Sequence, residues 1–163
     1  MRWHLVLFWF VLAAASSVKA QTVAKMEFLN GYWMLDVEAG NKLIHESLQA
    51  RYGEANVKSM DIVKLKNQFA SYVAENVLIY RDSVLMPMSP FHIELNSAKG
   101  LVRLISPRFE SHGDELLVKF GCFDDPGRSV RLVVIPENSR CIATLNEVNE
   151  FQADIILQEC ERQ

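Results

Sequence analysis

Residues 28–42 read FLNGYWMLDVEAGNK, and this stretch decides the fold class. From Gly31 to Val37, side chains alternate between two faces, which is typical of a half-buried β-strand. The side chains of Trp33 and Leu35 lie on the same, apolar face. Gly40 then ends the alternation, because glycine weakens a regular strand. A strand with one apolar face therefore stands near the start of the chain, and the following residues change period.

Two amphipathic helices are expected directly after this strand. In residues 41–53 apolar side chains recur at a four-residue interval, and Gly53 supplies a C-terminal stop. A second helix is expected from a cap at Ser59 through Val73. The apolar stripes of the two helices contain Leu43, Ile44, Leu48, Tyr52, Ile62, Leu65, Phe69, Tyr72 and Val73. Each stripe is stable only when it is buried against another element, so both helices should pack on a sheet.

After Glu75 the pattern becomes that of short strands separated by turn residues. The predicted strands are Val77–Tyr80, Val84–Met88, Phe91–Leu95, Leu101–Phe109, Leu116–Phe123, Ser129–Ile135, Arg140–Leu145 and Phe151–Gln158. Short connectors favour antiparallel neighbours, since a parallel pair needs a long crossover. The predicted fold is mainly β: an antiparallel meander forming a closed or nearly closed barrel, with two short helices inserted after the first strand.

The first 20 residues have the character of a signal peptide. Arg2 and His4 precede a continuous apolar run from Leu5 to Ala15, and small residues then lead to Ala20. The run is short for a membrane span, although an uncleaved anchor is the alternative. Residues 21–163 are then expected to form one domain, exported to the periplasm or the extracellular space without a stable membrane anchor.

The charge balance excludes a strongly basic binding surface. The full chain has 17 basic and 20 acidic residues, and removal of residues 1–20 makes it more acidic. Nucleic-acid binding requires a concentrated positive stripe, so we expect no nucleic-acid partner.

Three cysteines remain in the exported part of the chain, and two of them should form a disulfide. In the predicted meander, Cys141 and Cys160 lie on neighbouring elements, so their pairing is expected, with Cys122–Cys160 as the second choice. The remaining thiol is then either buried or available to another chain. The cysteine spacing matches no compact zinc pattern, and no metal or other cofactor is predicted.

The segment Gly31-Tyr32-Trp33 resembles the G-x-W signature of lipocalins, a calycin-type family of exported β-barrels. The resemblance implies that Gly31 and Trp33 close the barrel floor, with Arg162, or second Arg140, lying across the indole ring. The chain departs from that family because its helices come before the second strand, and it looks more like small exported lipocalin-like proteins of bacteria without an assigned activity. The alternative is that Trp33 is simply a core aromatic.

The first functional hypothesis is a non-catalytic binding protein that holds a small apolar ligand in the barrel. The residues expected to line that site are Trp33, Leu35, Phe91, Ile93, Leu116, Val118, Phe120, Val130 and Leu132. The alternative is that the side chains fill the barrel completely.

The second hypothesis is an exported inhibitor or immunity-like protein that binds a partner protein. It rests on acidic connectors, the segments GDE (113–115), FDD (123–125) and NEVNE (146–150), because recognition residues are commonly displayed on loops. An enzyme comes third. The histidines His45, His92 and His112 each have an acidic neighbour, but their positions are typical of solvated surface, and we predict no catalytic residues.

Overall fold

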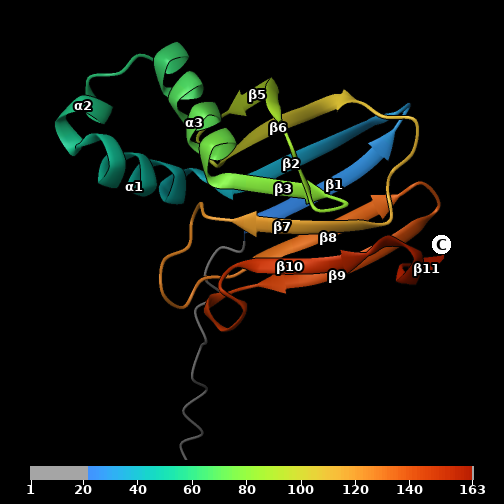
Figure 1. The fold of residues 1–163 in the computed structure, drawn as a ribbon. Helices are drawn as coiled ribbons and strands as arrows, with labels where there is room; N and C mark the ends of the chain where they lie inside the picture. The colour runs from blue at the N-terminus through green and yellow to red at the C-terminus, as the bar shows by residue number, and fades with distance from the viewer. Residues whose placement is uncertain (1–21, 163) are drawn as a thin grey trace, which may run out of the picture.

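The computed structural model describes residues 22–162, which form two sheets and a group of helices (Figure 1). The signal-peptide interpretation of residues 1–20 concerns a segment outside the described residues. The seven-stranded sheet has the order β11-β9-β8-β1-β2-β6-β5. Its strands, in chain order, are β1 (Thr22–Leu29), β2 (Tyr32–Gly40), β5 (Ser89–Leu95), β6 (Lys99–Arg108), β8 (Val130–Pro136), β9 (Ser139–Leu145) and β11 (Glu161–Arg162).

The four-stranded sheet has the order β10-β7-β3-β4. It consists of β3 (Val77–Arg81), β4 (Val84–Met86), β7 (Glu115–Phe120) and β10 (Gln152–Ile156). Two short 3₁₀ helices, Glu147–Asn149 and Leu157–Glu159, flank β10. The mainly β prediction is therefore confirmed.

The predicted closed barrel of a single antiparallel meander is wrong for residues 22–162, because the strands divide between two sheets. The prediction missed β1, which forms a hairpin with β2 across a turn at Asn30 and Gly31, both at positive φ. On its other side β1 pairs with β8 in parallel. The strand β1 thus separates β2 from β8, and the helices follow the second strand of the described chain rather than the first.

The helices lie together at one end of the sheets (Figure 1). They are α1 (Asn41–Tyr52), the short α2 (Glu54–Lys58) and α3 (Ile62–Asn76). The N-cap of α3 is Asp61 rather than the expected Ser59, and its carboxylate accepts a hydrogen bond from the backbone N–H of Lys64 at 2.8 Å. The predicted apolar stripes are buried in their central parts, as packing on a sheet requires.

A single apolar core joins both sheets to α1 and α3. Its largest fully buried side chains include Trp33, Phe69, Phe120 and Phe123. Gly100 on β6 lies under the helices, where a Cβ atom would be 2.5 Å from Ile44 Cδ1 and 2.7 Å from Phe69 Cε1. The missing side chain at this position lets both helices approach the sheet closely.

Candidate protein-binding surface

The residues predicted to line an internal ligand site are mostly core residues. Seven of the nine are buried within the core cluster, namely Trp33, Leu35, Leu116, Val118, Phe120, Val130 and Leu132. Ile93 is half-buried against the same core, whereas Phe91 is 66% exposed on the edge strand β5. Leu116 also contributes to the wall of a shallow cavity of about 320 Å³ between β7 and β10. These side chains therefore fill the interior.

Trp33 is fully buried at the start of β2 and is held through both of its N–H groups. The register of β2 against β6 shifts at Trp33, and the backbone N–H freed there donates to Ser106 Oγ at 3.0 Å. The indole Nε1 donates to the carbonyl oxygen of His112 at 3.1 Å. The ring also packs against Phe28, with centroids 5.3 Å apart. Trp33 thus has the environment of a core aromatic with a satisfied polar tip.

The cation near this indole is Arg81, which the sequence did not indicate. Its Nε donates to the same carbonyl oxygen of His112, at 3.3 Å, and its guanidinium lies over the ring of Phe109, 4.5 Å from the centroid. Arg162 is exposed on β11, and three strands of the sheet lie between β11 and β2. The structure therefore does not bring Arg162 to Trp33. Arg140 lies on β9, with two strands between it and β2.

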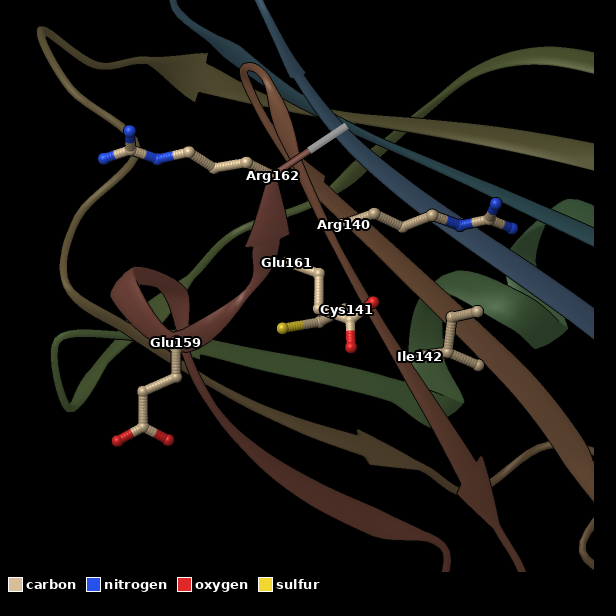
Figure 2. A pocket seen from close by; sticks show the side chains of 6 residues that line it. All are labelled: Arg140, Cys141, Ile142, Glu159, Glu161 and Arg162. Atoms are coloured by element: carbon tan, nitrogen blue, oxygen red, sulfur yellow. The ribbon is translucent and has the colours of Figure 1, made fainter.

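The predicted disulfide between Cys141 and Cys160 is confirmed, with a Cα–Cα distance of 4.8 Å. The connection differs from the expected hairpin, because β10 pairs with β7 and the short strand β11 after Cys160 pairs with β9. A shallow cavity of about 750 Å³ adjoins the bond, and Glu159, Glu161 and the two arginines around it point in different directions (Figure 2). Cys122 is a free, fully buried thiol whose pKa is raised by burial, so it is not poised as a nucleophile.

Two of the three acidic connectors are engaged with each other. The backbone N–H of Gly127 donates to the carboxylate of Glu147 at 2.6 Å, which joins the connector after β7 to the one after β9. Arg128 lies within 3.0 Å of Asp125 and within 3.4 Å of Glu46. Arg128 therefore offsets part of the acidity at this end, and Glu147 is engaged by a backbone N–H.

The third connector, residues 113–115, is positioned by Asp82 in the turn between β3 and β4. The Asp82 carboxylate accepts hydrogen bonds from the backbone N–H groups of Asp114 at 2.8 Å and Glu115 at 3.1 Å. Burial raises the pKa of Asp82. The two backbone hydrogen bonds and the Arg81 charge lower the pKa by more than burial raises it, so the pKa lies below its ordinary value. The connector therefore has a fixed place at the end of the four-stranded sheet.

The outer face of the seven-stranded sheet carries several pairs of charged or polar side chains across β1, β2, β6 and β5, with apolar residues such as Met34 and Ile105 between them. Asp36 forms two hydrogen bonds with Arg103, at 2.6 and 2.7 Å. The pairs Glu38–Lys99, Lys25–Glu27 and His92–Glu94 lie on the same face at 2.7, 2.8 and 2.8 Å. Such alternation of apolar inner and polar outer residues is expected of an antiparallel sheet exposed to water on one side.

The outer face of the four-stranded sheet breaks this rule. Tyr80 on β3 lies opposite Leu85 on β4 and Leu117 on β7, and all three point away from the core. Leu78 and Ile156 extend the patch along β3 and across to β10. Leu78 is 40%, Leu85 51% and Ile156 50% exposed. We call these five residues, Leu78, Tyr80, Leu85, Leu117 and Ile156, the apolar face.

Acidic groups lie directly beside members of the apolar face, with Glu115 opposite Ile156 and Asp154 opposite Leu117. A shallow cavity of about 320 Å³ is lined by Tyr80, Leu117 and Ile156 together with Ser83, Glu115 and Asp154. Glu115 belongs to the fixed third connector, and Ser83 Oγ donates to its carboxylate at 3.0 Å. On the opposite side Lys119 lies over the Tyr80 ring, 5.6 Å from the centroid. The surface thus combines an apolar centre with a carboxylate border.

The histidines of the described chain are dispersed over separate elements, with His45 on α1, His92 on β5 and His112 before β7. Within residues 22–162, no group of three or more His, Cys, Asp and Glu side chains is arranged to hold a metal ion. No helix in the same residues has the length and apolar character needed to cross a membrane. Neither a scan against protein-family models nor a search of curated proteins found a match for this chain.

Proposed function

We propose that this chain is an exported, non-catalytic protein that binds a partner protein through the apolar face of its four-stranded sheet. The partner segment that fits is one that presents apolar side chains flanked by lysine or arginine. The observation that carries the proposal is the group of five apolar side chains on the outer face of the four-stranded sheet, three of which are exposed.

The arrangement of side chains supports a protein partner. An aromatic ring flanked by leucines on the two neighbouring strands is typical of the centre of an interface, where tyrosine is enriched. The cavity beside it is shallow and only about 320 Å³, at the small end for a site that encloses an organic ligand.

The charges support a basic partner segment. Glu115 and Asp154 stand on the same side of the apolar face and line the same cavity, and the described ion pairs include neither of them. Opposite charges on the two sides of an interface select the partner and speed association. This interpretation keeps the hypothesis of recognition by acidic connectors, but restricts it to residues 113–115.

Export to the periplasm or extracellular space is part of the proposal. The Cys141–Cys160 disulfide is consistent with an oxidising compartment. A ligand inside the protein is less favoured, because most of the residues expected to line such a site pack against one another in the core.

A matched pair of variants tests the proposal. Ile156→Glu places a carboxylate on the apolar face, while Ile142→Glu makes the same change at a comparably exposed isoleucine, 54% exposed, on β9 of the other sheet. The exported fraction of the source cells is passed over immobilised wild-type protein and both variants. We expect wild type and Ile142→Glu to retain the same protein, and Ile156→Glu to lose it. The retained protein should also elute as salt rises, since the border charges are exposed.

Equal retention by all three proteins would contradict the proposal, and so would the absence of any protein retained specifically by the wild type. A hydrophobic fluorophore gives an independent readout, because exposed apolar patches bind such dyes. Its emission should fall with Ile156→Glu and stay unchanged with Ile142→Glu.

A further inference from the structure

The strand β5 is a long sheet edge without a covering strand. It is the last strand of the seven-stranded sheet and pairs with β6 on one side. The opposite end of that sheet is the two-residue β11, and the four-stranded sheet ends in the three-residue β4. The other end of the four-stranded sheet is β10, which lies beside β9 of the seven-stranded sheet (Figure 1). Proteins usually blunt free edges by shortening, covering or charging them, because an edge offers unpaired backbone groups to another strand.

Pro90 and the pairing irregularity beside it protect the first part of β5, whereas the second part offers a regular edge. Phe91 is 66% exposed, and the strand contains no lysine or arginine. An irregularity in the pairing with β6 lies between Pro90 and His92, so the regular part of the strand runs from His92 to Leu95. An exposed aromatic next to a regular edge of this kind is typical of a site that pairs with another chain.

The first turn of α3 also leaves apolar side chains exposed. Its apolar stripe contains Ile62, Leu65 and Phe69 at helical spacing, and α3 packs on β5 and β6. Leu65 and Phe69 are buried, whereas Ile62 is 55% exposed at the start of the helix. The neighbouring Val63 is also exposed. An additional strand beside β5 would offer a surface against which the exposed end of the α3 stripe could be buried.

We propose that β5 pairs antiparallel with β5 of a second copy of this chain, so that two seven-stranded sheets join into one across a two-fold axis at Ile93. The occupant is a second copy because the strand complements itself. The sequence His92-Ile93-Glu94 places an imidazole and a carboxylate, which lie 2.8 Å apart within one chain, on either side of an apolar residue. When Ile93 lies opposite Ile93 of the second copy, each His92 lies opposite Glu94 of the other copy.

Other registers are less favourable. Residues opposite each other in an antiparallel pair must point to the same face of the sheet, so the register shifts in steps of two. One step in either direction places His92 opposite His92, or Glu94 opposite Glu94. Two Glu94 carboxylates directly opposite one another destabilise a pair of strands, and a His92–His92 pair leaves neither imidazole opposite a carboxylate. A two-fold symmetric interface made from one self-complementary patch is the commonest form of homodimer.

Charge exchange between copies tests this pairing. His92→Glu gives each chain two carboxylates, and the double variant His92→Lys, Glu94→Lys gives each chain two ammonium groups. Each variant alone then brings like charges together in the dimer, while a mixture of the two variants brings opposite charges together. Sedimentation equilibrium of the processed chain, from about 1 µM to about 1 mM, covers the range of a modest interface.

We expect a concentration-dependent dimer for the wild type and a dissociation constant at least about tenfold higher for each variant alone, which is a difference of about 1.4 kcal/mol. Mixing the two variants should restore association, with the mixed dimer identified by native mass spectrometry. Within one chain, His92 and Glu94 of the wild type lie 2.8 Å apart, whereas residues 92 and 94 of each variant carry like charges. Mixing the variants does not change this repulsion within each chain. Rescue by mixing therefore reports pairing between copies.

A second readout locates the interface. Amide hydrogen exchange at residues 92–95 should slow as protein concentration rises, and exchange in β11 should not. Ile156→Glu serves as the control, because it lies on the apolar face and should leave the dimer unchanged. His92→Glu should likewise leave capture of the exported partner unchanged, so failure of one proposal is distinguishable from failure of the other.

Three results would overturn the dimer: a wild-type chain that stays monomeric through that concentration range, a dimer that both charge variants form equally well, or a dimer without concentration-dependent protection of β5.

Discussion

The indole of Trp33 and the guanidinium of Arg81 share one acceptor, the carbonyl oxygen of His112, with donor–acceptor distances of 3.1 and 3.3 Å. Trp33 comes from the seven-stranded sheet and Arg81 from the four-stranded sheet. The connector that carries His112 is thereby tied to both sheets. This shared carbonyl fixes how the ends of the two sheets meet, and it lies next to the connector that borders the apolar face.

Replacement of Trp33 by Phe should destabilise the fold. The change removes the Nε1 donor and part of a fully buried ring, so a cavity forms and Arg81 becomes the sole remaining side-chain donor of this pair. Loss of buried volume and of a buried hydrogen bond together should lower the free energy of unfolding by about 2–4 kcal/mol. Urea denaturation followed by far-ultraviolet circular dichroism measures the change. A midpoint equal to that of the wild type would show that the shared carbonyl contributes nothing.

Replacement of Gly100 by Ala should loosen the helices from the sheet. The new methyl group would lie 2.5 Å from Ile44, 2.7 Å from Phe69 and 3.0 Å from Leu95, so at least one of these side chains must move. Overpacking of this kind costs about 1–3 kcal/mol. Thermal denaturation checks the stability, and hydrogen exchange in α1 and α3 should show where the packing has loosened. Lys99→Ala, at the exposed neighbouring position, should have little effect on exchange in the helices.

Local sequence patterns predicted many of the strands and helices, but they did not predict how the strands pair into two sheets. The strand expected over Leu101–Phe109 is β6 (Lys99–Arg108), and the alternation around Trp33 is β2, because a period of two reports burial of one face. The strand β1 was missed even though its inner residues Ala24 and Met26 are fully buried, since it directly follows the apolar leader in sequence. Its position between β2 and β8 depends on pairing with a strand about 100 residues away in the sequence, and local alternation carries no information about that pairing.

For the site residues too, the sequence predicted which face of a strand a side chain lies on, but not which distant residues it contacts. Alternation placed Leu116, Val118 and Leu132 on inner faces, where they are buried, but it could not show whether the interior is hollow or filled. Phe91 is exposed because it stands at the pairing irregularity of an edge strand. Arg81 reaches the His112 carbonyl only because the two sheets are brought together in space. The outward leucines of β3, β4 and β7 were a signal in the sequence, since they interrupt the expected polar face.

Removal of the disulfide should weaken the last strand most. The bond between Cys141 and Cys160 closes a segment with a sequence separation of 19, for which loss of the crosslink costs about 3 kcal/mol in the chain-entropy description. The strand β11 has only two residues and pairs with β9, so it should separate first. We expect a lower midpoint of thermal unfolding for the double variant Cys141→Ser/Cys160→Ser and for the reduced wild type. Hydrogen exchange at residues 161–162 should rise in both.

Cys122→Ala is the matched control for that double variant, because Cys122 is a buried, free thiol. It should retain the response of the midpoint to reductant. A reductant effect that disappears in Cys122→Ala would contradict the assignment of the crosslink to Cys141 and Cys160.

The Asp82 carboxylate should contribute stability that depends on pH. Because its folded-state pKa lies below 3.8, the value for the free side chain, the ionised form is favoured by folding. Its contribution is fully present above pH 3.8 and is lost as pH falls through the lower folded-state pKa. Since the side chain is 39% exposed, solvent screening keeps this contribution within about 1 kcal/mol. Asp82→Asn retains an acceptor oxygen but removes the charge, so it isolates the ionic part of the two backbone hydrogen bonds.

The free energy of unfolding should therefore differ between wild type and Asp82→Asn at pH 6, and the difference should be smaller at pH 2.5, below the pKa of 3.8 of the free side chain. Glu137→Gln, on the exposed turn between β8 and β9, controls for the loss of one negative charge and should change little at either pH. Because Asp82 holds the backbone of Asp114 and Glu115, the same substitution should also weaken retention of the partner protein at pH 6. A stability difference of equal size at both pH values would mean that the charge of Asp82 is not what positions this connector.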